Sequence, residues 1–170
     1  MTRRAILFVL GFAALAVPLP AVAQQHMDMP GMHMHETKAG TFRPGLGDLM
    51  TAFVQPRHIK LGFAGAEGNW VYAAYELHEL REAFDDVAKL IPRHGKLEIP
   101  AAIASTVKLP LEAIDQAIKS KDQGAFTKAY AELTASCNAC HVSADHPMIV
   151  IQVPTVAGAA FPDQDFRPQK

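Results

Sequence analysis

The sequence has few cysteines, a short hydrophobic run and little net charge, and each of these shortages excludes a class of protein. Only two cysteines occur among 170 residues, whereas a secreted domain built on disulfides needs several, spread along the chain. The apolar run over residues 5–17 is shorter than the ~20 residues with which a helix crosses a bilayer. A formal net charge of −1 provides no general attraction for nucleic acid or anionic lipid. We therefore expect a protein that binds neither.

The N-terminus has the three parts of a secretory signal. Arg3 and Arg4 precede the apolar run, and the small-x-small triplet Ala21-Val22-Ala23 follows it. The sequence predicts that residues 1–23 are a signal peptide and that the protein is exported to the periplasm, with no stable membrane insertion after cleavage. An uncleaved N-terminal anchor is the alternative. Residues 24–170 suit one domain with a single core.

Residues 24–45 are rich in His, Met, Gly and Pro and have no apolar period, which predicts a flexible arm. Three histidines and four methionines fall within residues 26–35. Thioethers favour Cu(I), and imidazole also accepts Cu(II). The composition therefore predicts copper binding, although a low-complexity linker of incidental composition is the alternative. The expected copper ligands are His26, Met29, Met32, His33, Met34 and His35.

From Leu46 onward the apolar residues recur with the period of a helix. Asn69 is a good N-cap, and Gly65 and Gly68 supply a stop for the helix before it. Pro56 and Pro110 each fall inside an expected helix: Pro56 predicts a kink or a split, and Pro110 predicts a second kink. The expected helices cover about residues 46–64, 69–91, 100–119 and 122–141.

Four helices joined by short Gly/Pro connections predict an all-α fold, an up-down-up-down four-helix bundle over residues 46–141. Residues 142–170 would form an irregular C-terminal extension. Within it, residues 148–153 read as a short extended or β-prone run.

Cys137-Asn-Ala-Cys140-His141 has the spacing of a c-type haem attachment site. One helical turn between the thiols suits thioether bonds to the two vinyl positions of a single porphyrin, and the next imidazole can then bind the iron. The motif continues a stripe that advances by three and four and faces the expected core. We predict one covalent haem c on Cys137 and Cys140, with His141 as the proximal ligand. The stripe consists of Phe126, Tyr130, Leu133, Cys137 and Cys140.

Other uses of the two cysteines fit less well. A thioredoxin-like redox pair lies at a helix N-terminus, where the dipole lowers the thiol pKa, whereas this pair falls near a helix end. A structural zinc site needs two more ligands at suitable spacing. A disulfide across two residues would add little stability.

The sequence resembles the class II c-type cytochromes, the cytochrome c-prime group. The resemblance rests on Cys137, Cys140 and His141 near the end of the last helix, and on the number and order of the helices over residues 46–141. The resemblance implies a distal residue on the first helix. In class I cytochromes the motif comes near the N-terminus and a methionine ligand follows well downstream, whereas here 29 residues follow His141. The chain also continues further past the motif than typical class II proteins do. The segment Arg57–Leu61, with Asn69-Trp70 and Tyr75-Glu76, also resembles an exported cytochrome family of uncertain role.

The sixth iron position decides between electron transfer and gas binding, because a closed iron carries electrons and an open iron binds ligands. At 1.5 Å per residue in antiparallel helices, the level of His141 corresponds to about residues 46–50 of the first helix. Met50 fits this level, and His58 lies about 12 Å further along. His146, Met148 and an open iron are the remaining candidates, and Arg57 and Lys60 could pair with haem propionates.

These patterns together predict a periplasmic monohaem electron carrier that exchanges electrons with redox partner proteins and is not an enzyme. A homodimer is consistent with the class II resemblance and an apolar helical surface. Two alternatives stay open: a gas-binding or gas-sensing cytochrome with an open distal face, and a copper-handling protein that uses the arm.

Overall fold

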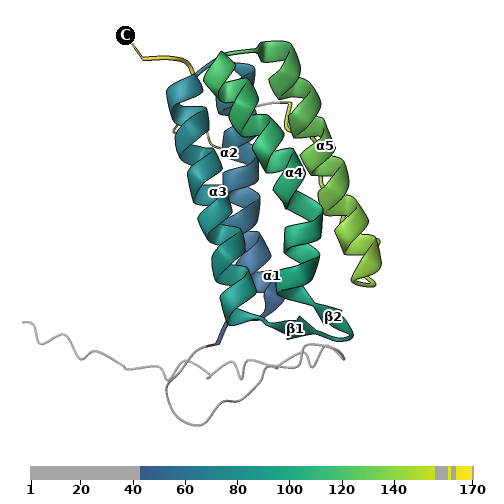
Figure 1. Cartoon of the computed structure of the whole chain (residues 1–170). Helices are drawn as coiled ribbons and strands as arrows, with labels where there is room; N and C mark the ends of the chain where they lie inside the picture. The colour runs from purple at the N-terminus through teal and green to yellow at the C-terminus, as the bar shows by residue number, and fades with distance from the viewer. Residues whose placement is uncertain (1–42, 156–160, 162–163, 170) are drawn as a thin grey trace, which may run out of the picture. The chain divides into compact units, whose positions relative to one another are not determined.

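A computed structural model describes residues 43–155, 161 and 164–169. The predicted signal peptide, nearly all of the arm and all six expected copper ligands lie outside these residues. Within them the chain is an all-α bundle, which confirms the predicted fold class (Figure 1). The elements are α1 (Leu46–Leu49), the π-helix η1 (Met50–Val54), α2 (Gln55–Ala66), α3 (Trp70–Leu90), β1 (Arg93–His94), β2 (Leu97–Glu98), α4 (Ile99–Ser120) and α5 (Gln123–Ser143).

The first expected helix continues over residues 46–66 without a break, and its backbone takes π-helical form in η1, just before the proline. The Gln55 amide donates to the Met50 carbonyl in the wider π-helical pattern, and Pro56, which has no N–H to donate, follows at the start of α2. The expectation that Gly65 stops this helix is wrong, because α2 continues to Ala66 and Gly65 is a close packing position. Gly68, with a positive φ of 66°, marks the actual stop.

The cap of α3 is the expected one, and α5 begins where the sequence predicted, with a cap of its own. The Asn69 side chain accepts a hydrogen bond from the Tyr72 amide at 3.2 Å, and the Asp122 side chain accepts one from the Ala125 amide at 2.9 Å. Each cap satisfies an amide that has no partner within its own helix. The starts of both helices are therefore determined locally.

The connection before α4 differs from the expectation. A two-stranded hairpin, β1–β2, joins α3 to α4 and was not predicted. Gly95, with a φ of 57°, supplies its turn. The helix α4 runs through Pro110 as one element, so the chain does not split there.

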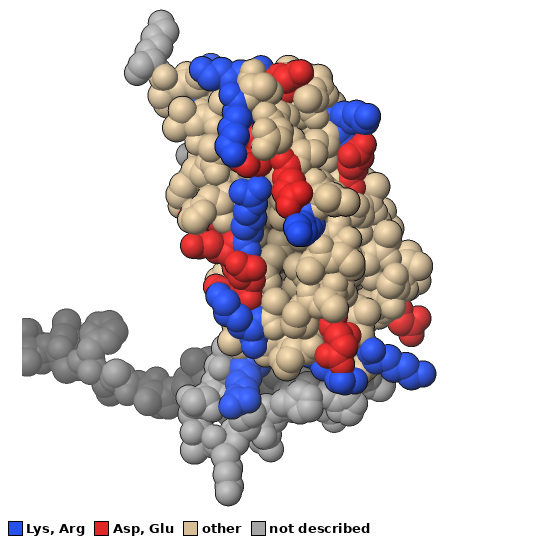
Figure 2. Space-filling model, viewed as in Figure 1, with Lys and Arg blue, Asp and Glu red and all other residues tan. Residues whose placement is uncertain are grey.

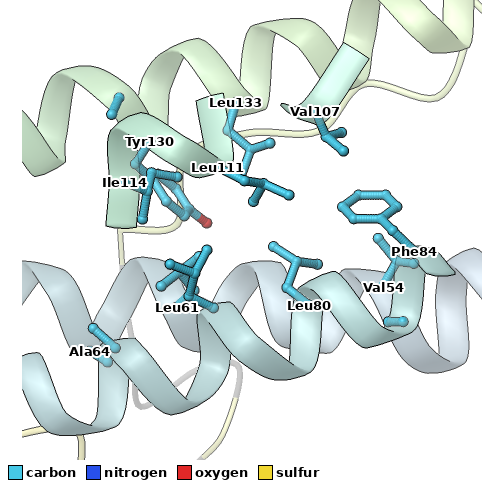
Figure 3. Packing of buried hydrophobic residues seen from close by; sticks show 14 of the residues in the cluster. Val54, Leu61, Ala64, Leu80, Phe84, Val107, Leu111, Ile114, Tyr130 and Leu133 are labelled. Carbon is cyan, nitrogen blue, oxygen red and sulfur yellow. The ribbon is translucent and has the colours of Figure 1, made fainter. Parts of the chain in front are cut away.

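Apolar side chains from all four long helices form one core. Leu80 of α3 points toward Leu111 of α4 and Leu133 of α5 (Figure 3). These three side chains are at most 5% exposed. The apolar stripes predicted for α3 and α5 therefore both face the common core, as the helical period required.

Antiparallel packing of α2 and α5 brings the beginning of the bundle to the end of its last helix. The Gln123 side chain, at the start of α5, donates to the carbonyl of Gly65 near the end of α2, with Nε2–O 2.9 Å. Leu46 and Met50, at the beginning of the bundle, accordingly share a cavity with Cys140 and His141. The fold thus joins the first and last segments of the bundle at one end.

The C-terminal extension returns along the bundle instead of leaving it. Pro154 lies against Gly62 of α2, and Phe166 is 2% exposed, with its ring 5.2 Å from that of Phe63. The Asn69 side chain also donates to the Phe166 and Arg167 carbonyls, both at 3.1 Å. These contacts hold the described part of the extension against the end of α2 and the start of α3.

Basic and acidic side chains are mixed over the face seen in Figure 2. Several pair with each other, among them Lys119 with Asp115 at 2.7 Å and Lys89 with Asp86 at 3.2 Å. Among the described residues, no helix has the length and apolar character needed to span a bilayer.

Candidate functional site

A cavity of about 200 Å³ lies at the end of the bundle where α1 and η1 meet the end of α5. Its walls are mostly apolar and come from every helix, the hairpin and the extension, and it opens to solvent on one side. Six residues named as candidate haem attachment sites or iron ligands line this one cavity: Met50, His58, Cys137, Cys140, His141 and His146.

The two thiols are half-buried and are not joined in a disulfide. Burial, and to a smaller extent the neighbouring Cys140, raises the pKa of Cys137 to about 11. Both cysteines lie in the last two turns of α5, which ends at Ser143. A nucleophilic redox cysteine has a lowered pKa at a helix N-terminus, so this environment is opposite to the one that thiol–disulfide exchange uses.

The His141 ring is oriented by the extension. Its Nδ1 lies 2.9 Å from the backbone carbonyl oxygen of Ile149. A carbonyl can only accept, so Nδ1 carries the proton and Nε2 keeps a free lone pair. Histidines that bind metals are held in this way in general, with one ring nitrogen donating to a carbonyl or carboxylate and the other facing the metal.

Met50 and His58 differ in whether the atoms that could bind iron already have hydrogen-bond partners. Met50 is half-buried, packs on the edge of the core and begins the π-helical turn η1; such turns are frequent at functional sites. His58 is buried, with 3% of its surface exposed. Its two ring nitrogens lie 3.0 Å from Tyr130 Oη and 3.0 Å from Thr134 Oγ1.

A count of the available protons assigns the donor and the acceptor of each hydrogen bond in this buried network. The Tyr130 hydroxyl donates to the His58 carbonyl at 2.6 Å, and the Thr134 hydroxyl donates to the Tyr130 carbonyl at 3.0 Å. Burial lowers the pKa of His58 to about 4, so the ring carries one proton at neutral pH. That proton lies on Nε2 and is donated to Thr134, while Tyr130 shares its proton between the His58 carbonyl and Nδ1. Neither ring nitrogen then offers a free lone pair to a metal.

The expected partners for haem propionates are engaged elsewhere. Arg57 pairs with Glu76 at 3.3 Å and Glu79 at 2.9 Å, and Lys60 lies 5.0 Å from the centre of the Phe161 ring. Neither basic side chain lines the cavity, so the structure does not support that pairing. Glu76 is 1% exposed, and Arg57 therefore compensates a buried carboxylate.

Two further histidines lie at the cavity. His94 of the hairpin and His146, just beyond α5, both line it, with their ring centroids 5.6 Å apart. From the sequence, His146 is one of several candidates for the sixth iron position, whereas His94 was not singled out. Only the hairpin, which has no strong sequence signal, brings these two rings together.

Within the part of the chain that the structure describes, the one cluster of three metal-ligating side chains is His78, Glu79 and Glu82 on α3. It contains neither cysteine, so these residues provide no closed zinc site around the thiols. It is exposed at His78 and Glu82, and the Glu79 carboxylate already pairs with Arg57.

Comparison with protein-family models, with curated proteins and with solved structures found no match for this chain.

Proposed function

We propose that this protein is an exported monohaem c-type cytochrome that carries electrons between redox proteins. The observation that carries the proposal is the convergence of Cys137, Cys140 and His141 on one mostly apolar cavity, with His141 Nε2 free. The two half-buried thiols and the imidazole lone pair on Nε2 suit covalent haem attachment and iron ligation. When bound, haem would supply a one-electron couple, and the apolar walls would lower the local dielectric and thereby tune its potential.

We assign the distal position to Met50 rather than to His58. Met50 lines the cavity with no polar partner to give up, whereas His58 would have to leave two hydrogen bonds at 3.0 Å. Breaking buried hydrogen bonds costs about 1–3 kcal/mol for each group left unsatisfied. The carrier function follows from this assignment, because a closed iron needs no substrate pocket and no catalytic acid or base.

The test is a visible spectrum of the protein purified from the periplasm, in both redox states, with and without carbon monoxide. We expect haem that stays attached under denaturing conditions and a sharp reduced spectrum that carbon monoxide leaves unchanged. Met50→Ala should open the iron to carbon monoxide, while His58→Gln should leave the iron closed. Loss of the closed spectrum in His58→Gln alone would assign the distal position to His58 instead.

Matched cysteine variants test the attachment. Cys137→Ala combined with Cys140→Ala should abolish covalent haem, whereas Ser143→Ala, at the exposed end of the same helix, should leave it in full. Wild-type protein without a Soret band would overturn the proposal. An open iron in the wild type would instead indicate gas binding.

A further inference from the structure

Two side chains of the Cys137–His141 motif hold the same piece of the C-terminal extension. His141 Nδ1 donates to the Ile149 carbonyl at 2.9 Å. The Asn138 side chain donates to the Ile151 carbonyl at 2.9 Å and accepts from the Ile151 amide at 2.7 Å. Asn138 therefore pairs with Ile151 much as a neighbouring strand would, satisfying both backbone groups of one residue.

Hydrogen bonds hold this segment more than burial does. Met148, Ile149 and Val150 are 74%, 44% and 64% exposed, so little apolar surface anchors the carbonyl that accepts from His141. The Ile149 amide donates to the His146 carbonyl at 3.1 Å, which closes the turn before it. After Ile149, the next hydrogen bonds that hold the segment to a side chain are the two between Asn138 and the Ile151 backbone.

We propose that Asn138 is a positioning residue for His141: it fixes Ile151 and thereby holds the Ile149 carbonyl where it orients the imidazole. The proposal rests on the function proposed above. Asn138 touches neither the iron position nor a substrate and acts only through the extension. Its effect on the haem would be electronic, because a carbonyl on Nδ1–H makes the imidazole a stronger donor and favours ferric iron.

A purely structural role for Asn138 is the competing explanation, and Gln164 provides the control. Gln164 ties the same extension to the Tyr72 hydroxyl at a different place. Gln164→Ala should loosen the extension without moving residues 149–151. Asn138→Ala removes both hydrogen bonds to Ile151, and Asn138→Asp keeps only the one that Oδ1 accepts from the Ile151 amide.

The experiment uses the haem-loaded full chain and measures the reduction potential and the hydrogen exchange of the His141 Nδ1 proton. In Asn138→Ala we expect a higher reduction potential. We also expect the His141 Nδ1 proton to exchange about tenfold faster, which corresponds to the loss of one hydrogen bond of about 1.4 kcal/mol. Asn138→Asp should fall between this variant and the wild type. Gln164→Ala should lower the melting temperature and leave both readouts unchanged.

The proposal is overturned if Asn138→Ala alters only the melting temperature, or if Gln164→Ala shifts the potential equally. A nitrogen NMR spectrum of His141 separates this failure from failure of the proposed function. It reports the ring tautomer whether or not haem is bound, so protein without haem would still show the Nδ1–H form in the wild type and a mixture of tautomers in Asn138→Ala.

Discussion

The two ends of this bundle are built differently, although the same helices run through both. At the end where α2 passes to α3 and α4 passes to α5, glycine brings the backbone of α2 against an aromatic ring of α5. A Cβ added to Gly65 would lie 2.0 Å from Phe126 Cζ. At the opposite end, Met50, Cys137 and His141 surround a cavity of about 200 Å³. We call these the closed end and the cavity end.

The difference shows how one bundle can combine stability with a site. Close packing at the closed end supplies dispersion and apolar burial, and the side chains there have no chemistry to perform. At the cavity end, side chains that can bind a metal line the walls, and hydrogen bonds from His58, Asn138 and His141 connect the surrounding segments. The predictions below test this division.

The largest expected effect is at the closed end. Gly65→Ala would force Phe126 or the backbone of α2 to move, and overpacking of this severity should lower the free energy of unfolding by about 3 kcal/mol or more. The matched control is Gly124→Ala at the exposed start of α5, where the nearest atom is 3.5 Å away. Its effect should stay within about 1 kcal/mol. Equal urea midpoints for the two variants would contradict a tightly packed closed end.

The next effect concerns pH and the buried His58. The pKa of His58 is lowered to about 4 in the folded chain, from 6.5 in the unfolded chain. The unfolded chain therefore binds more protons below pH 6.5, so stability should be full above that pH and fall as the pH drops to about 4. The loss should reach about 3 kcal/mol.

Carboxylates also titrate in part of this range, so the informative quantity is the difference between the wild type and His58→Gln. The free energy of unfolding of His58→Gln should fall less steeply between pH 6.5 and 4. Parallel pH profiles would show that His58 is not held neutral by the fold.

A smaller effect at the closed end separates the contribution of a helix cap from that of hydrogen bonds to the C-terminal extension. Asn69 caps α3 and also donates to the carbonyls of Phe166 and Arg167, whereas Asp122 caps only α5. Asp122→Ala should cost about 1 kcal/mol and Asn69→Ala about 2 kcal/mol. Thermal unfolding of both variants measures the difference, and equal losses would mean that the extension adds nothing through Asn69.

The smallest effect is expected in the hairpin. Arg93 and Glu98 pair across its strands, but their side chains are 64% and 53% exposed, and exposed pairs contribute about 0–1 kcal/mol. Glu98→Ala should therefore change the melting temperature little and leave the visible spectrum of the haem-loaded protein unchanged. A marked spectral change would show that the hairpin, which carries His94, helps to shape the cavity.

Several features could be predicted from the sequence because they depend on neighbours along the chain. The caps Asn69 and Asp122, the stripe through Phe126, Tyr130 and Leu133, and the helical setting of the Cys137–His141 motif all follow from spacing of a few residues. The rise of a helix also placed Met50 near the level of His141, and both line the same cavity.

Other features were wrong or missed because they depend on residues far apart in sequence. The local sequence predicts that Gly65 stops a helix. Its actual role is to leave room for the Phe126 ring, which becomes apparent only when α2 and α5 are in contact. His58 is buried only because Tyr130 and Thr134, more than 70 positions later, satisfy its ring. Nothing in the spacing indicates that Asn138 pairs with Ile151 or that Ile149 accepts from His141.

The sequence by itself determined the all-α class and the helix starts, since local hydrogen bonding and the apolar period dictate them. It also contains the motif from which we propose a haem. Only the tertiary structure decided which nitrogen of His141 is free, why His58 holds no free lone pair and how the extension reaches the site. Those properties depend on contacts between distant segments, and such contacts exist only once the apolar stripes have packed and brought the first and last segments of the bundle to one cavity.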